Sequence, residues 1–240
     1  MQHRPQLFYT TEPAPCPYLP NRMERKVLTD LSGPEAASLH DRLSQAGFRR
    51  SHTIAYAPVC MDCRACKPMR LPVALFHPSR TQQRLWKRHQ DIKITIAAPV
   101  PTQEQFVLFQ AYQKNRHTDG DMAHMSWQEY ADLISNTPVE TIVVEFRTPA
   151  DQLICVSLVD VMSDGLSAVY TFYDTTITAE SWGTFSILWL LNLAEQRGYL
   201  HLYLGYYVPG SQKMAYKAKF RPAEIFQSGH WTPLNIPSET

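Results

Sequence analysis

The stretch from residue 166 to residue 207 constrains the fold of this chain more than any other. Residues 167–173 are β-branched and aromatic, as in a strand, and residues 200–204 alternate in the same way before Gly205. Between them, residues 184–197 have the length and composition of a helix that is apolar nearly all round, which indicates burial. The pattern predicts a β-α-β unit whose helix crosses over a sheet.

The carboxyl ends of these two predicted strands mark the expected ligand site. Open α/β sheets bind ligands beyond the carboxyl ends of their strands, and the loop 174–183 opens there. The tail 206–220, just past the second strand, adds tyrosines and lysines that can take part in chemistry. We therefore expect the functional site at this edge of the sheet.

The chain is expected to divide at the Pro-Val-Pro break of residues 99–101. We predict an N-terminal domain, residues 1–99, that holds clustered cysteines and a basic segment, and a catalytic domain, residues 100–240. After residue 101 the predicted elements run helix, helix, three strands, helix and strand. This order resembles the GNAT-type acyltransferases, an α/β (α+β) fold with a mixed sheet.

The loop 174–183 argues against coenzyme A as the acyl donor. A member of this fold that uses coenzyme A normally has a Gly-rich, Arg-containing loop here, whose backbone N–H groups hold the pyrophosphate. This loop has one glycine, Gly183, and two acids, Asp174 and Glu180. We expect no coenzyme A, and an acyl-CoA-dependent N-acyltransferase of the same fold is the main alternative.

A basic segment stands out on a chain whose formal net charge is only +1. Residues 64–93 hold eight Lys or Arg and one Asp, a formal charge of +7 that leaves −6 for the rest. Ser79 has the N-cap position of a helix to about residue 90. Four of its cations share one face: Arg80, Arg84, Lys87 and Arg88. Such a stripe is typical of contact with a polyanion or of a solvated helix face.

Five motifs, in order along the chain, resemble those of the aminoacyl-tRNA-protein transferases, the family of eukaryotic arginyl-tRNA-protein transferase. They are residues 116–122, 170–174, 181–185, 203–206 and 214–220. The likeness covers nearly the whole chain and is greatest to short bacterial members. It implies a smaller N-terminal domain packed on the acyltransferase-like one.

The resemblance also implies an activity. It is the transfer of leucine from leucyl-tRNA to the α-amine of proteins that begin with Asp or Glu, which marks them for degradation by the N-degron pathway. Leucine rather than arginine rests on the resemblance alone. The basic stripe suits it, because Lys and Arg hold tRNA mainly through phosphates, and Trp86 can stack on a base or anchor the helix.

Such a transfer is the aminolysis of an activated ester. An N-terminal amine titrates near ~8, so a sizeable neutral fraction exists without a strong base. The protein must align amine and ester, accept and supply a proton, and stabilise an oxyanion. Candidates at or near the strand ends are Tyr170, Tyr173, Asp174, Tyr206 and Asp160. The alternative for the tyrosines is a packing role as core or cross-strand partners.

Recognition of an acidic N-terminal residue needs a cation or a set of hydrogen-bond donors. The candidates are Arg116, His117, Lys213 and Lys217. Structural alternatives are that His117 only supports the fold and that Lys217 only neutralises the polar tail.

Four cysteines have the ligand count of a zinc or iron-sulfur site: Cys16, Cys60, Cys63 and Cys66. The eukaryotic relatives bind an iron-sulfur cluster, whose first cysteine pair has C-x2-C form. Here Leu19 stands where the second thiol of that pair would be, and Lys67 follows Cys66 directly. A metal-free fold with clustered thiols is the alternative, and the transfer itself requires no cofactor. Cys155 is expected to be a small core residue.

We expect a cytoplasmic protein. Five cysteines, an odd number, fit reduced thiols better than a disulfide framework. No run approaches the roughly 20 apolar residues that cross a bilayer, and the first residues lack an apolar signal segment. The expected partners are thus aminoacyl-tRNA and proteins that begin with Asp or Glu, with no membrane. An alternative from another class is a cysteine-metal nucleic-acid-binding module without catalysis.

Overall fold

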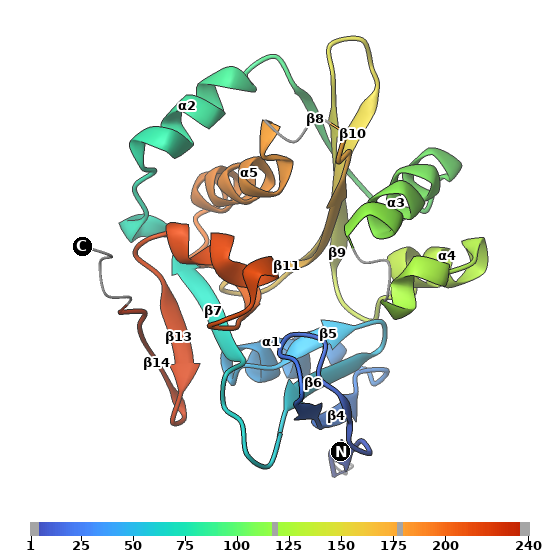
Figure 1. The fold of residues 1–240 in the computed structure, drawn as a ribbon, viewed down its shortest axis with the longest axis vertical. Coiled ribbons are helices and arrows are strands. Elements are labelled where there is room, and N and C mark those ends of the chain that lie inside the picture. Colours follow the sequence, from blue (N-terminus) through green and yellow to red (C-terminus); the bar gives the residue numbers. More distant parts are fainter. Residues whose placement is uncertain (1–4, 117–119, 177–179, 236–240) are drawn as a thin grey trace.

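The computed structural model describes residues 5–116, 120–176 and 180–235. One large sheet runs through the molecule (Figure 1) and has eight strands. They are β7 (Lys67–Pro72), β8 (Lys93–Ala97), β9 (Thr141–Arg147), β10 (Leu153–Val161), β11 (Gly165–Tyr173), β12 (His201–Tyr207), β13 (Glu224–Gln227) and β14 (His230–Pro233). Their order is β14-β13-β7-β12-β11-β10-β9-β8, and β11 and β12 form the one parallel pair among these described strands.

A smaller antiparallel sheet lies at the lower end of the molecule in Figure 1. Its strands are β1 (Tyr9–Thr10), β4 (Lys26–Asp30), β6 (Ile54–Pro58) and β5 (Arg49–Ser51). The helix α1 (Ala36–Gln45) packs against it, and β2 (Ala14–Pro15) pairs with β3 (Met23–Glu24). These strands and this helix lie within the N-terminal domain predicted over residues 1–99.

Helices cover both faces of the large sheet (Figure 1). On one face lie α2 (Arg80–Arg88) and α5 (Trp182–Gln196), and on the other α3 (Gln103–Arg116) and α4 (Trp127–Ser135). Short 3-10 helices are η1 (Val73–Leu75), η2 (Asp121–His124) and η4 (Gln212–Lys219). Because α5 is apolar on nearly every side, it lies at the centre of the larger hydrophobic core. None of the described helices is long and apolar enough to cross a membrane.

The structure confirms the predicted β-α-β unit and the predicted fold class. β11, α5 and β12 follow one another along the chain, and β11 and β12 pair in parallel. The N-cap predicted at Ser79 is also present, as a capping box with Gln82. The sequence pattern missed that β7 pairs with both β12 and β13 in the large sheet. The division at residue 99 stays a prediction. β7 and β8 precede it along the chain and belong to the large sheet.

The two parallel strands separate toward their carboxyl ends. Pairing of β11 with β12 ends at Ser167 and Tyr203. Both strands are irregular nearby: β10 and β11 shift register at Leu158, and β12 shifts against β7 before Gly205, whose φ is +74°. The separation forms a wedge between residues 168–173 of β11 and residues 204–207 of β12.

Candidate active site

Two basic side chains fill the wedge between β11 and β12. Arg49, from β5 of the small sheet, donates through Nη2 to the carbonyl oxygen of Ala168 at 2.5 Å and through Nη1 to Ser167 Oγ at 3.2 Å. Lys217, from η4, donates through Nζ to the carbonyl oxygens of Leu204 and Tyr206 at 2.7 and 2.8 Å. The two side chains thus satisfy carbonyls for which the separated strands offer no partner.

Lys217 is buried, and its surroundings change its acidity. Desolvation, followed by repulsion from Arg49, lowers the pKa of its amine to about 7. A neutral amine still has two N–H groups, enough for both of its hydrogen bonds. The role predicted for Lys217 in binding the substrate N-terminus stays a prediction, but its described contacts are with the backbone.

Beside the wedge, aromatic and polar side chains from α3, β11 and η4 gather into what we call the tyrosine cluster. It consists of Tyr112, Gln113, Arg116, Tyr170, Tyr173 and Tyr216. Gln113 Nε2 donates to the Tyr170 hydroxyl at 2.7 Å, and Arg116 Nη2 donates to the Tyr173 hydroxyl at 3.2 Å. The guanidinium carbon of Arg116 also lies 6.0 Å from the centre of the Tyr173 ring.

The cluster presents protonated hydroxyls beside one guanidinium. Burial raises the pKa of Tyr170 to about 12. Tyr216 is 38 % exposed as a residue, yet desolvation of its hydroxyl, together with Tyr173, raises its pKa to about 12. Burial raises the pKa of Tyr112 as well. These three hydroxyls therefore remain hydrogen-bond donors at neutral pH.

The start of α5 packs closely on the cluster. A Cβ added at Gly183 would lie 3.3 Å from Cε1 of Tyr173. Asp174, the next residue after β11, accepts from the backbone N–H of Thr176 at 2.8 Å and from its hydroxyl at 2.7 Å. Asp174 thus holds a turn, and its predicted catalytic role stays a prediction.

Asp160 and Tyr206 lie apart from this cluster, against the small sheet. The Asp160 carboxylate is fully buried and accepts from Arg50 Nε at 2.7 Å, Arg50 Nη2 at 2.6 Å and Thr141 Oγ1 at 2.9 Å. The Tyr206 hydroxyl donates to the carbonyl oxygen of Tyr56 at 3.1 Å. The structure therefore separates side chains that we expected to share one task, and their predicted roles stay predictions.

Two further predicted substrate-binding residues differ in how they are placed. Lys213 is exposed on η4. His117 lies outside the described residues. Arg116 is exposed at the end of α3, and among the residues that the structure describes no carboxylate lies within ion-pair distance of it. Arg116 is thus the predicted cation that joins the tyrosine cluster directly.

The four clustered thiols line one cavity of about 50 Å³ together with Tyr18 and Tyr206. They are Cys16, Cys60, Cys63 and Cys66. Burial, and then the neighbouring thiols, raise the pKa of Cys66 to about 12. Within the described part of the chain, no three His, Cys, Asp or Glu side chains are placed to hold a metal ion. The thiols therefore gather around one cavity, and their predicted role as metal ligands stays a prediction.

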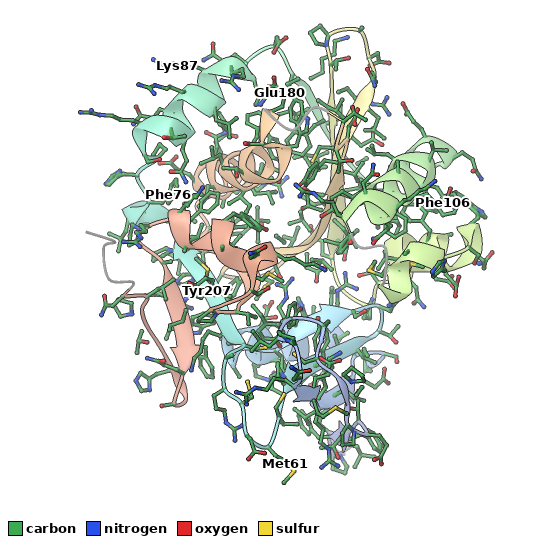
Figure 2. The ribbon with its side chains drawn as sticks, viewed as in Figure 1. Met61, Phe76, Lys87, Phe106, Glu180 and Tyr207 are labelled. Atoms are coloured by element: carbon green, nitrogen blue, oxygen red, sulfur yellow. The ribbon has the colours of Figure 1, made fainter. Side chains whose placement is uncertain are left out.

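The predicted cationic stripe lies on the outer face of α2. All four of its side chains are exposed, and Lys87 points away from the molecule in Figure 2. Trp86, on the inner side, packs on Phe185 of α5 with ring centres 5.7 Å apart, which makes it a helix anchor. At the end of α2, His89 stacks on Trp182 and donates through Nε2 to the backbone oxygen of Glu180 at 2.8 Å. The helix is thus fixed to the start of α5.

Sequence reasoning missed Arg49, Tyr112 and Gln113. No local pattern distinguishes Arg49 from Arg50, its neighbour in β5, although their side chains enter different parts of the molecule. Tyr112 and Gln113 precede Arg116 by one helical turn, so all three share one face of the helix. That spacing was the one signal in the sequence that could have placed them beside Arg116.

A mixed sheet whose parallel strands separate toward their carboxyl ends, with polar side chains gathered there, is the fold of the GNAT-like acyltransferases. Two family models match the chain: arginine-tRNA-protein transferase, N terminus, over residues 14–84, and arginine-tRNA-protein transferase, C terminus, over residues 104–227. The chain belongs to the arginine-tRNA-protein transferase family.

Curated relatives resemble the chain over almost its full length. An aspartate/glutamate leucyltransferase of Gluconobacter oxydans is 67% identical over 98% of both chains. Another, of Gluconacetobacter diazotrophicus, is 56% identical over 98% of this chain and 92% of its own. Among solved structures, the C-terminal DUF2156 domain of a protein described as a lysylphosphatidylglycerol synthetase, from Agrobacterium fabrum, superposes with a TM-score of 0.53. It covers 84% of this chain and 64% of its own at 13% identity, and so shares the fold alone.

Proposed function

We propose that this chain transfers leucine from leucyl-tRNA to the α-amine of proteins that begin with Asp or Glu, and so marks them for degradation. The observation that carries the proposal is a likeness of 67%, from end to end, to an aspartate/glutamate leucyltransferase. The exposed guanidinium of Arg116 beside the donor hydroxyls of the tyrosine cluster supports it. A charged-tRNA substrate places the reaction in the cytoplasm.

The chemistry needs alignment and hydrogen-bond donors more than a strong base. The neutral α-amine attacks the aminoacyl carbonyl carbon, a C–N bond forms, and the bond to the ribose oxygen breaks. One proton moves in total from the attacking nitrogen to the departing oxygen. The Tyr170 and Tyr216 hydroxyls, protonated at neutral pH, are suited to donate to the oxyanion or the leaving oxygen.

An assay with competing donors tests this proposal. The purified protein would be mixed with labelled leucyl-tRNA, arginyl-tRNA or acetyl-CoA, and with peptides that begin with Asp, Glu or Ala. We expect leucine in the acidic peptides, none in the Ala peptide, and no acylation from acetyl-CoA. We also expect transfer to persist after treatment with a metal chelator, because ester aminolysis requires no cofactor. Transfer of arginine instead of leucine, or acylation from acetyl-CoA alone, would contradict the proposal.

Replacing Arg116 with glutamine is expected to lower kcat/KM for peptides that begin with Asp or Glu by about 10-fold to 100-fold. The reason is the loss of a charge-assisted hydrogen bond to the substrate carboxylate, worth about 1.5–3 kcal/mol. Steady-state transfer from leucyl-tRNA gives the measurement. Arg116→Lys keeps the charge without the planar fork, and its kcat/KM should lie between the values for wild type and Arg116→Gln. Arg42→Gln, exposed on α1, is the control. Equal kcat/KM for wild type and Arg116→Gln would remove this role.

A further inference from the structure

We propose that η4 is the platform for the single-stranded 3′ end of the aminoacyl-tRNA, and that it leads this strand from α2 to the tyrosine cluster. The inference rests on the proposed function and adds the path of the tRNA. Its phosphates would contact Lys213 and Lys219, and the ring of Tyr216 would lie between them.

The shape of η4 sets these three side chains in a row. In a 3-10 helix, residues three apart lie directly above one another, with about 6 Å of rise per turn. Lys213, Tyr216 and Lys219 are spaced in this way, and all three are exposed. We call them the Lys-Tyr-Lys row. The neighbouring row faces inward, because Lys217 and Phe220 are buried.

The row is joined to α2 at one end. Gln82, a buried residue of α2, donates through Nε2 to the carbonyl oxygen of Lys219 at 3.3 Å. Phe76, just before α2, stacks on Phe220, with ring centres 6.1 Å apart. Figure 1 shows η4 in orange-red below α5, on the side of the molecule that carries α2. A strand that leaves the cations of α2 can therefore continue along η4.

The middle of the row reaches the reaction centre. The rings of Tyr112 and Tyr173 lie 5.0 Å apart. Tyr216 lies near both, because Tyr173 adds to the effect of desolvation in raising the pKa of Tyr216, and Tyr173 and Tyr216 add to it in raising the pKa of Tyr112. Lys217, the next residue, is held by the two backbone carbonyls of β12 and fixes η4 over the wedge. An ester at the end of the strand would thus meet the tyrosine cluster.

The charge of the segment favours a polyanion over the acidic side chain of the protein substrate. Residues 208–223 contain four Lys or Arg and no Asp or Glu. Among the residues that the structure describes, no carboxylate lies within ion-pair distance of Lys213 or Lys219. One substrate carboxylate cannot meet two lysines that are two turns apart, whereas successive phosphates can. Cations that flank an aromatic ring are typical of single-stranded nucleic-acid sites.

The test separates the 3′ end from the rest of the tRNA. Two donors are compared: whole leucyl-tRNA, and a leucylated single-stranded RNA that has only the sequence of the 3′ end. We expect Lys213→Glu/Lys219→Glu to raise KM by about tenfold or more for both donors. Arg80→Glu/Arg84→Glu should raise KM for whole tRNA alone. For the short donor, log(1/KM) is also plotted against the logarithm of the salt concentration. In Lys213→Glu/Lys219→Glu the size of this slope should be smaller than in wild type by about 1.4, because two phosphate contacts are lost.

The control is Arg42→Glu/Arg197→Glu, which reverses two exposed charges, one on α1 and one at the far end of α5. Thermal unfolding checks that all variants are folded, and Lys213→Gln/Lys219→Gln should give a smaller rise in KM in the same direction. If Lys213→Glu/Lys219→Glu has the same KM for the short donor as the control, the proposed path of the 3′ end is overturned and the proposed function stays intact. A wild-type protein that transfers leucine from neither donor overturns both.

Discussion

Replacing Arg50 with methionine is expected to lower the free energy of unfolding by about 3–5 kcal/mol. The substitution leaves the Asp160 carboxylate buried without its cation. That carboxylate has no exposed surface, and Arg50 supplies two of its hydrogen bonds, at 2.7 and 2.6 Å. His40, whose Nε2 lies 3.4 Å from the carboxylate, does not replace the cation, because burial lowers its pKa and keeps it neutral.

Denaturant unfolding at neutral pH measures this effect. Arg42→Met, exposed on the neighbouring helix α1, is the matched control and should change stability by less than about 0.5 kcal/mol. Arg50→Met/Asp160→Leu removes both charges and should recover much of the loss, because an apolar pair avoids the desolvation cost. A loss below about 1 kcal/mol for Arg50→Met alone would mean that Asp160 takes up a proton or water instead.

The ion pair between Arg50 and Asp160 also positions a side chain of the candidate site. Arg49 and Arg50 are neighbours in β5, and successive side chains of a strand point to opposite faces. Arg50 binds Asp160 of β10, while Arg49 enters the wedge and binds the backbone of β11. Fixing one of them therefore orients the other. The small sheet contributes to the active site by this route, as well as by packing.

Local patterns predicted the elements that have strong periodicity or clear end signals. The helix α5 is apolar nearly all round, and β11 and β12 contain β-branched and aromatic residues. Ser79 and Ser126 each form the capping box that their spacing indicates. These features depend on residues within a few positions of one another, which is why the sequence alone revealed them.

Long-range pairing was not available from such patterns. The insertion of β7 between β12 and β13 joins segments more than 120 residues apart, and no local signal encodes it. The wedge depends on where β11 and β12 stop pairing, and so does the burial of Lys217. Tyr206 was expected beside Tyr170, but it faces Tyr56 of the small sheet. Proximity along the sheet edge does not fix the face to which a side chain points.

Replacing Lys217 with methionine is expected to change how stability depends on pH. Unfolded Lys217 keeps its proton up to about its ordinary pKa of 10.5, whereas the folded amine releases it near the lowered pKa of about 7. Between these values the unfolded state binds more protons, so stability rises with pH. The wild type should therefore gain stability relative to Lys217→Met as pH rises from 7 to 10. At 1.36 kcal/mol per pH unit, the gain is at most about 4 kcal/mol.

Denaturant unfolding of both proteins across this pH range provides the measurement, because other titrating groups cancel in the difference. Lys213→Met and Lys219→Met, exposed on the same helix, are matched controls whose stability curves should run parallel to the wild type. Leucyl transfer by Lys217→Met should also decline at every pH, since the carbonyls of Leu204 and Tyr206 lose their donor and η4 loses its attachment. A constant difference between wild type and Lys217→Met would show that the amine stays charged in the wedge. In that case the amine would need a third hydrogen-bond partner beyond the two carbonyls that hold it.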